Sequence, residues 1–98
     1  MIKFGQEMQE IQRGGFDHLI NEQYILPLDD GYEVSVIRGP VTYGGDEGLF
    51  EMAIRDAEHR CSAYDVDVDI FGGDVLGYLT EEQVTEHLAT LKERHAKK

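Results

Sequence analysis

The sequence contains one cysteine and no long hydrophobic run, and each scarcity excludes a class of protein. Because Cys61 is alone, neither an intrachain disulfide nor a four-cysteine zinc site can form, and we expect a reducing, cytoplasmic environment. No apolar stretch approaches the roughly 18 to 20 residues that cross a bilayer. Glu7, Glu10 and Asp17 lie near the N-terminus and argue against a signal peptide. We therefore expect no membrane association.

Basic residues are also scarce. Nine Lys and Arg side chains stand against 20 Asp and Glu side chains, which gives a formal net charge of −11 at pH 7. Such an excess of negative charge repels DNA, RNA and anionic lipid head groups. The composition argues against direct nucleic-acid binding and favours solubility, a partner protein with a basic surface, or competition for a nucleic-acid-binding surface.

The length and the apolar content predict one folded domain that spans residues 1–98. A chain of 98 residues has no room for a second core, and 41% hydrophobic with 30% charged residues is typical of a folded soluble chain. Because the core of so short a chain is small, a binding surface is a more natural expectation than a deep active site.

Helical spacing of apolar residues occurs near both ends of the chain. Two short N-terminal stretches show it on either side of a pair of glycines: Phe4, Met8 and Ile11, then Phe16, Leu19 and Ile20. At the other end, the segment 79–98 predicts a longer helix, in which Thr80 and Gln83 match a capping box. Its buried stripe consists of Val84, Leu88 and Leu91.

Alternating residues in the middle of the chain predict β-strands at 32–38 and 49–57, joined as an antiparallel hairpin. One register buries the apolar residues and also forms a cross-strand ion pair. It pairs Val34 with Ile54, Val36 with Met52 and Glu33 with Arg55.

The segment "YDVDVDI" at 64–70 alternates in the same way and predicts a third strand. Its apolar face would carry Tyr64, Val66, Val68 and Ile70, and the opposite face would carry Asp65, Asp67 and Asp69, each roughly 6.6 Å from the next. The predicted fold is therefore α+β, a small three-stranded mostly antiparallel sheet packed against N- and C-terminal helices. The expected core comprises Phe4, Met8, Ile11, Val34, Val36, Phe50, Met52, Ile54, Val66, Val68, Leu79, Val84, Leu88 and Leu91.

Catalytic and metal motifs fail in their details. The three aspartates at 65–69 resemble the start of a calcium loop, but Ile70 and Leu76 stand where that loop needs glycine and glutamate. The glycines of the 38–48 loop have the spacing of a P-loop, but Gly45 and Asp46 stand where lysine and Ser/Thr are required. We predict a non-enzymatic protein with no catalytic residue, no metal and no cofactor.

Two surfaces are candidates for binding. Residues 61–91 contain seven acids and no lysine or arginine, so the strand and the helix start could together form an acidic patch. The alternative is a solvated face that only keeps the protein soluble. The second candidate is the long glycine-rich loop 38–48, which carries an aromatic residue near its tip. The predicted binding residues are Asp65, Asp67, Asp69 and Asp74, with Tyr43 and Glu47 from the loop.

Two stretches, "GYEVSVIRGPVTYGGDEGLFEMAIRD" and "DVLGYLTEEQV", resemble a group of small, mostly uncharacterised proteins encoded by tailed bacteriophages. In that group a strand, a Tyr-Gly-Gly loop, a Gly-Leu-Phe-Glu strand and a Gly-Tyr-Leu-Thr helix start occur in this order. The resemblance covers about residues 31–91. It implies a phage protein made in the bacterial host cytoplasm, and it brings no catalytic residue with it.

The leading prediction is a small acidic accessory protein that binds and modulates a host or phage protein through an acidic surface. Two alternatives remain open. One is a nucleic-acid mimic that inhibits a DNA- or RNA-binding protein, which requires two rows of acids along a duplex-like track. The other is a structural or assembly component, such as a homodimer formed through an exposed strand edge or helix.

Overall fold

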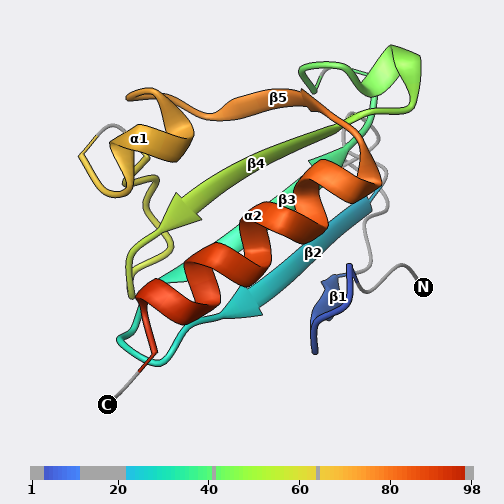
Figure 1. The fold of residues 1–98 in the computed structure, drawn as a ribbon. Coiled ribbons are helices and arrows are strands. Elements are labelled where there is room, and N and C mark those ends of the chain that lie inside the picture. The colour runs from blue at the N-terminus through green and yellow to red at the C-terminus, as the bar shows by residue number, and fades with distance from the viewer. Residues whose placement is uncertain (1–3, 12–21, 41, 64, 97–98) are drawn as a thin grey trace.

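The computed structural model contains a five-stranded antiparallel sheet with one long helix across one face (Figure 1). The structure describes residues 4–11, 22–40, 42–63 and 65–96. The strands follow one another across the sheet in chain order, from β1 to β5. Within these residues, the elements are β1 (Gln9–Ile11), β2 (Glu22–Pro27), β3 (Glu33–Arg38), the 3-10 turn η2 (Gly45–Glu47), β4 (Phe50–Arg55), the single-turn helix α1 (Val68–Phe71), β5 (Leu76–Leu79) and α2 (Glu81–Arg94).

The predicted three-stranded sheet between N- and C-terminal helices is wrong. Instead of a helix, residues 4–11 form a turn and then strand β1, which pairs with β2. The turn is incompatible with a helix because Phe4 and Gly5 both have positive φ, 49° and 70°. Phe4 is nevertheless buried, with its ring packed edge-on against Tyr24 and Phe50. The second predicted helical stretch, 16–20, lies outside the described residues.

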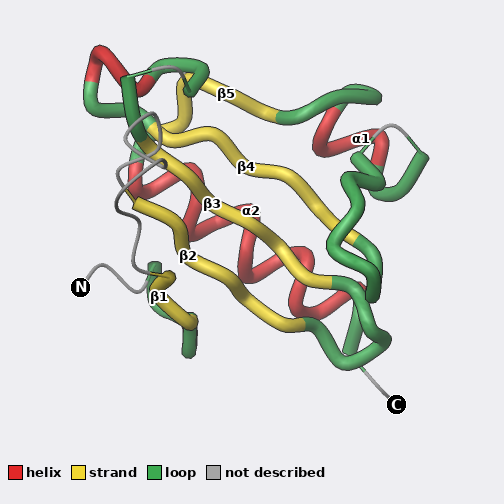
Figure 2. Tube along the Cα trace, turned by 180° about the vertical axis from the view of Figure 1, so that it is seen from behind, coloured by secondary structure: helices red, strands yellow, loops and turns green. Residues whose placement is uncertain are grey.

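Strand β2 was not predicted. Four consecutive residues of this strand, from Gln23 to Leu26, are buried. Its sequence therefore lacks the alternation of apolar and polar residues that marks a strand with one solvent-exposed face. Tyr24 and Leu26 face the main core on the helix side, whereas Gln23 donates a hydrogen bond to Ser35 on the other face. Figure 2 shows that other face, over which no described helix lies.

The predicted hairpin register between β3 and β4 is confirmed. Val34 lies opposite Ile54, Val36 opposite Met52, and Glu33 opposite Arg55, with an ion pair between the last two. The four apolar residues are fully buried. A slip by one residue would turn all four away from α2, so burial specifies the pairing.

The C-terminal helix is confirmed as well. Thr80 accepts a hydrogen bond from the backbone N–H of Gln83, whose side chain accepts one from the backbone N–H of Thr80. This reciprocal capping satisfies two backbone donors and fixes where α2 begins. Its apolar stripe of Val84, Leu88 and Leu91 is fully buried against the sheet.

The predicted third strand at 64–70 is also wrong. Residues 65–67 form turns and Val68–Phe71 form α1, while the strand beside β4 is β5, farther along the chain. Of the core residues predicted in this segment, Val66 is only half-buried and Val68 is 51% exposed. Phe71, which was not predicted, is buried in the core instead. The side chain of Ile11 lies outside the described part of the structure.

Candidate functional site

The four aspartates predicted as one acidic face do not share a strand face. Asp67 precedes α1 in a left-handed conformation, with φ 51°, and its carbonyl accepts hydrogen bonds from the N–H groups of Ile70 and Phe71. Asp65 is exposed in the turn before it. Asp74 is exposed beyond α1, where its carboxylate accepts a hydrogen bond from the N–H of Val75. The segment therefore coils and does not extend.

Two of these aspartates are bound to the end of α2. Arg94 donates hydrogen bonds to Asp67 at 3.1 Å and to Asp69 at 2.9 and 2.7 Å. The hydrogen bonds from Arg94 lower the pKa of Asp69, and those to Asp69 and Asp67 raise the pKa of Arg94. Asp67 and Asp69 thus hold α1 against α2, and their charge is compensated inside the molecule.

His95 joins the same cluster. Its Nδ1 lies 2.5 Å from a carboxylate oxygen of Asp30, and its Nε2 lies 2.7 Å from a carboxylate oxygen of Asp67. Burial acts to lower the pKa of His95, but the hydrogen bonds to Asp67 and Asp30 and the charges of both carboxylates outweigh it and raise that pKa. The imidazolium form connects the β2–β3 turn, the α1 segment and the end of α2.

Side-chain hydrogen bonds hold the 38–48 loop in a folded-back conformation. The hydroxyl of Thr42 donates to the carbonyl of Gly39 and accepts from its N–H, so the loop folds back on itself. The N–H of Tyr43 donates to the carboxylate of Glu51 on β4. These bonds direct the ring of Tyr43 outward, where it is 56% exposed.

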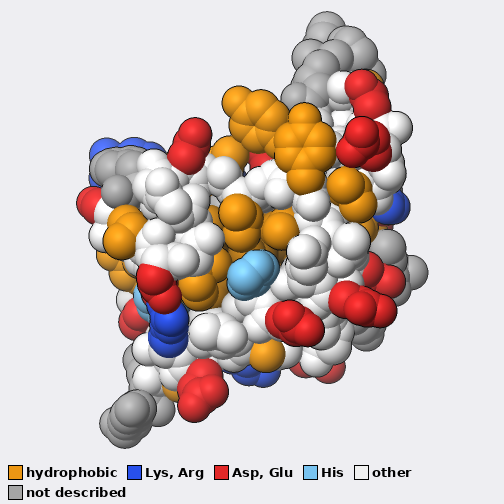
Figure 3. Space-filling model, turned by 45° about the horizontal axis from the view of Figure 1, so that its top comes forward, with side chains coloured by type: hydrophobic (Ala, Val, Ile, Leu, Met, Phe, Trp, Pro, Cys, Tyr) orange, Lys and Arg blue, Asp and Glu red, His pale blue; other side chains and the backbone are white. Residues whose placement is uncertain are grey.

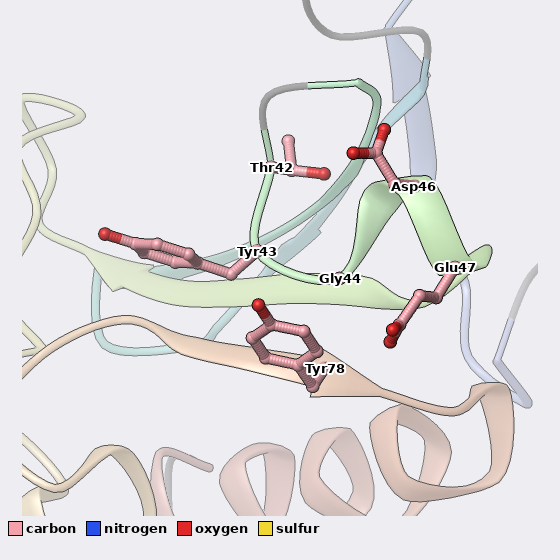
Figure 4. Close-up of a pocket in the computed structure, with 6 residues that line it drawn as sticks. All are labelled: Thr42, Tyr43, Gly44, Asp46, Glu47 and Tyr78. Atoms are coloured by element: carbon pink, nitrogen blue, oxygen red, sulfur yellow. The ribbon is translucent and has the colours of Figure 1, made fainter.

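A cleft of about 200 Å³ lies where this loop meets β5. We call it the aromatic cleft; its lining residues are Thr42, Tyr43, Gly44, Asp46, Glu47 and Tyr78. Figure 4 shows the rings of Tyr43 and Tyr78 on the same side of the chain, with the hydroxyl of Tyr78 directed toward Tyr43. Tyr78 is 61% exposed, so both rings present most of their surface to solvent. Figure 3 shows hydrophobic side chains that project from this face beside acidic ones.

The backbone holds the two tyrosines together from segments that are far apart in the sequence. The N–H of Tyr78 donates to the carbonyl of Tyr43 at 3.1 Å. A Cβ at Gly77 would overlap the Cβ of Tyr43, and one at Gly44 would lie 2.9 Å from the Cα of Tyr78. The glycines therefore permit the close approach. The Tyr-Gly-Gly and Gly-Tyr-Leu-Thr stretches of the sequence meet at this point.

Tyr78 adopts an unusual conformation for an aromatic residue. Its φ is 56°, in the left-handed region, which is an outlier for a bulky side chain outside a turn. Tyr43 and Glu47 are predicted from the sequence, whereas Tyr78 and Asp46 are not. The signal that could have indicated Tyr78 was a glycine directly beside a tyrosine, present in both segments.

The described residues contain no group of three His, Cys, Asp or Glu side chains placed to hold a metal ion. Within the same residues, no helix has the length and the apolar character needed to cross a bilayer. The side chains of Asp46 and Glu47 are exposed, and neither forms an ion pair with another described residue. They are thus free to attract a cation.

Comparison with protein-family models finds no match, and neither do comparisons with curated proteins and with solved structures. The resemblance to small phage proteins stays a prediction.

Proposed function

We propose that this protein is a non-enzymatic binding domain that recognises a partner protein with a basic surface, and that the aromatic cleft is its contact site. This keeps the predicted class of function and the predicted loop residues Tyr43 and Glu47, but it replaces the four aspartates with Tyr78 and Asp46. Asp67 and Asp69 are engaged with Arg94, whereas Tyr43, Tyr78, Asp46 and Glu47 face solvent together.

The observation that carries the proposal is the exposed ring of Tyr78 on a left-handed backbone. A non-glycine residue in that region costs roughly 1–2 kcal/mol, and the ring gains little from burial because it is 61% exposed. Strained residues of this kind concentrate at binding sites, where the surrounding structure holds them in place. Tyrosine is also enriched in the energetically important centres of protein interfaces.

Charge supports a basic partner. The net charge of −11 attracts a cationic surface over a distance, and the free carboxylates of Asp46 and Glu47 concentrate part of that charge beside the two rings. Association steered in this way is fast, and its rate falls as the salt concentration rises. In a phage setting, the partner would be a host or phage protein in the bacterial cytoplasm.

The two alternative functions have less support. A nucleic-acid mimic needs rows of free carboxylates, but Asp67 and Asp69 are paired with Arg94. A homodimer through β5 would have to accommodate the left-handed Tyr78 on its edge, which interrupts a regular strand edge. Sedimentation at two protein concentrations separates this dimer from a monomeric binder.

Affinity capture with the wild type and two variants tests the proposal. The Tyr43→Ala/Tyr78→Ala double variant removes both rings, and Val68→Ala is the matched control because Val68 is likewise exposed but lies on α1. We expect a protein that wild type and the control retain, that the double variant loses and that moderate salt releases. Capture of the same proteins by the wild type and by both variants would refute the aromatic cleft as the contact site.

A further inference from the structure

The aromatic cleft combines two chemical features that a cationic side chain can use at once. The exposed ring faces of Tyr43 and Tyr78 attract a cation through their π-electrons. The free carboxylate of Glu47, at the other end of the cleft, can supply a hydrogen-bonding counter-charge. Several other acids are already paired within the molecule, such as Glu22 with Arg38 and Glu33 with Arg55.

The two carboxylates of the cleft differ in direction. Figure 4 shows Glu47 extending from η2 toward the side on which the ring of Tyr78 lies, whereas Asp46 points away from that ring. A cation resting on Tyr78 therefore meets Glu47 first. Asp46 acts only through its longer-range field, which solvent and salt screen.

We infer that the aromatic cleft binds an arginine side chain of the partner, with the guanidinium against the ring of Tyr78 and paired with the carboxylate of Glu47. The inference rests on the proposed function and specifies its ligand. Tyr43 closes the other side of the cleft and is held there by the hydrogen bond between its carbonyl and Tyr78.

Arginine fits this arrangement better than lysine. A guanidinium is planar, stacks on aromatic faces and can donate two parallel hydrogen bonds to one carboxylate. It is also more weakly hydrated than an ammonium group, so less solvation is lost when it enters a cleft of about 200 Å³. An ammonium can use the same charges but cannot stack.

A titration with short blocked peptides tests the inference directly. Gly-Arg-Gly, Gly-Lys-Gly and Gly-Gly-Gly are added at matched ionic strength, and the ring resonances of Tyr43 and Tyr78 are followed by NMR. Because exposed cation–π contacts and surface ion pairs are individually weak, we expect the arginine peptide to bind with a dissociation constant on the order of 10 mM. The lysine peptide should bind about threefold more weakly, and the glycine peptide should leave both resonances unchanged.

Two charge variants provide the matched control. Glu47→Gln should weaken the arginine peptide by about threefold, whereas Asp46→Asn, which removes the same charge from the neighbouring residue, should change it by less than about 1.5-fold. The backbone amide spectrum of each variant verifies the fold. Equal effects of the two variants, equal affinity for lysine, or no saturable shift with arginine would each overturn the inference.

The result of the peptide titration can be distinguished from the result of the capture experiment. If the two tyrosines are needed for capture but the arginine peptide does not bind, the proposed function stands and the ligand is wrong. If the peptide binds but capture does not depend on the tyrosines, the proposed function is wrong although the cleft still takes a guanidinium.

Discussion

Replacing Tyr78 by glycine and, separately, by alanine measures the strain in its backbone. Both changes remove the same ring, so lost side-chain contacts are nearly equal in the two variants. What differs is the backbone, because φ is 56° at this position. That conformation costs an L-residue roughly 1–2 kcal/mol and costs glycine almost nothing.

The expected difference follows from two opposing contributions. Relief of the left-handed strain favours the glycine variant by about 1.5 kcal/mol. The greater freedom of glycine in the unfolded chain opposes it by about 0.4–1 kcal/mol. Tyr78→Gly should therefore be more stable than Tyr78→Ala by roughly 0.8 kcal/mol. With a urea m value of about 1.2 kcal/mol/M, the midpoints should differ by roughly 0.7 M.

Urea unfolding followed by circular dichroism provides the measurement. The control is Ala89→Gly on the exposed side of α2, where glycine should be less stable than alanine by about 1 kcal/mol. The sign of the Gly–Ala difference should thus reverse between positions 78 and 89. If Tyr78→Gly is instead the less stable variant, position 78 is unstrained and the argument from strain to binding is refuted.

Three further predictions concern the rest of the fold. Because the folded pKa of His95 is raised, the contribution of His95 to the stability of the fold is complete below the unfolded pKa of about 6.5 and is lost as pH rises through the higher folded value. His95→Gln should therefore flatten this decline of the unfolding free energy with pH, and an unchanged slope would contradict the prediction. Thr80→Ala should lower the unfolding free energy by about 1 kcal/mol through loss of the capping box, measured by urea unfolding. Leu88→Ala, at a fully buried position, should cost about 2–5 kcal/mol in the same assay, and a cost below about 1 kcal/mol would show a loosely packed core.

The parts of the fold that could be predicted are those whose signals are local. The register of β3 and β4 follows from the alternation in each strand, since only one pairing buries Val34 and Met52 together. The start of α2 follows from a capping box within four residues of sequence. In both cases the neighbouring residues supply most of the information.

The segment 64–70 could not be predicted because its pattern is ambiguous. Val66 and Ile70 are four residues apart, so they fall on one face of a helical turn as well as on one face of a strand. The choice depends on partners that are distant in sequence: Arg94 lies 27 residues from Asp67, with which it forms a hydrogen bond. The spacing of Phe4 and Met8 wrongly predicted a helix for the same reason, because Phe4 is buried in the core from a turn.

The candidate site was half predicted. Loop composition indicated Tyr43 and Glu47, since a long glycine-rich loop with an aromatic residue is a common binding element. Alternation could not indicate Tyr78, because a sequence pattern does not reveal its positive φ. The contact between Gly77 and Tyr43 joins residues 34 positions apart and depends on the whole sheet.

Helix α2 also determines how the molecule can be attached to a surface. It begins three residues after Tyr78 and runs for 14 residues, which places its C-terminal end roughly 20 Å away along the axis. Figure 1 shows the C-terminal end of α2 on the opposite side of the molecule from η2. A linker fused there would leave the tyrosine face pointing into solution, so immobilisation through the C-terminus suits binding measurements on a sensor chip.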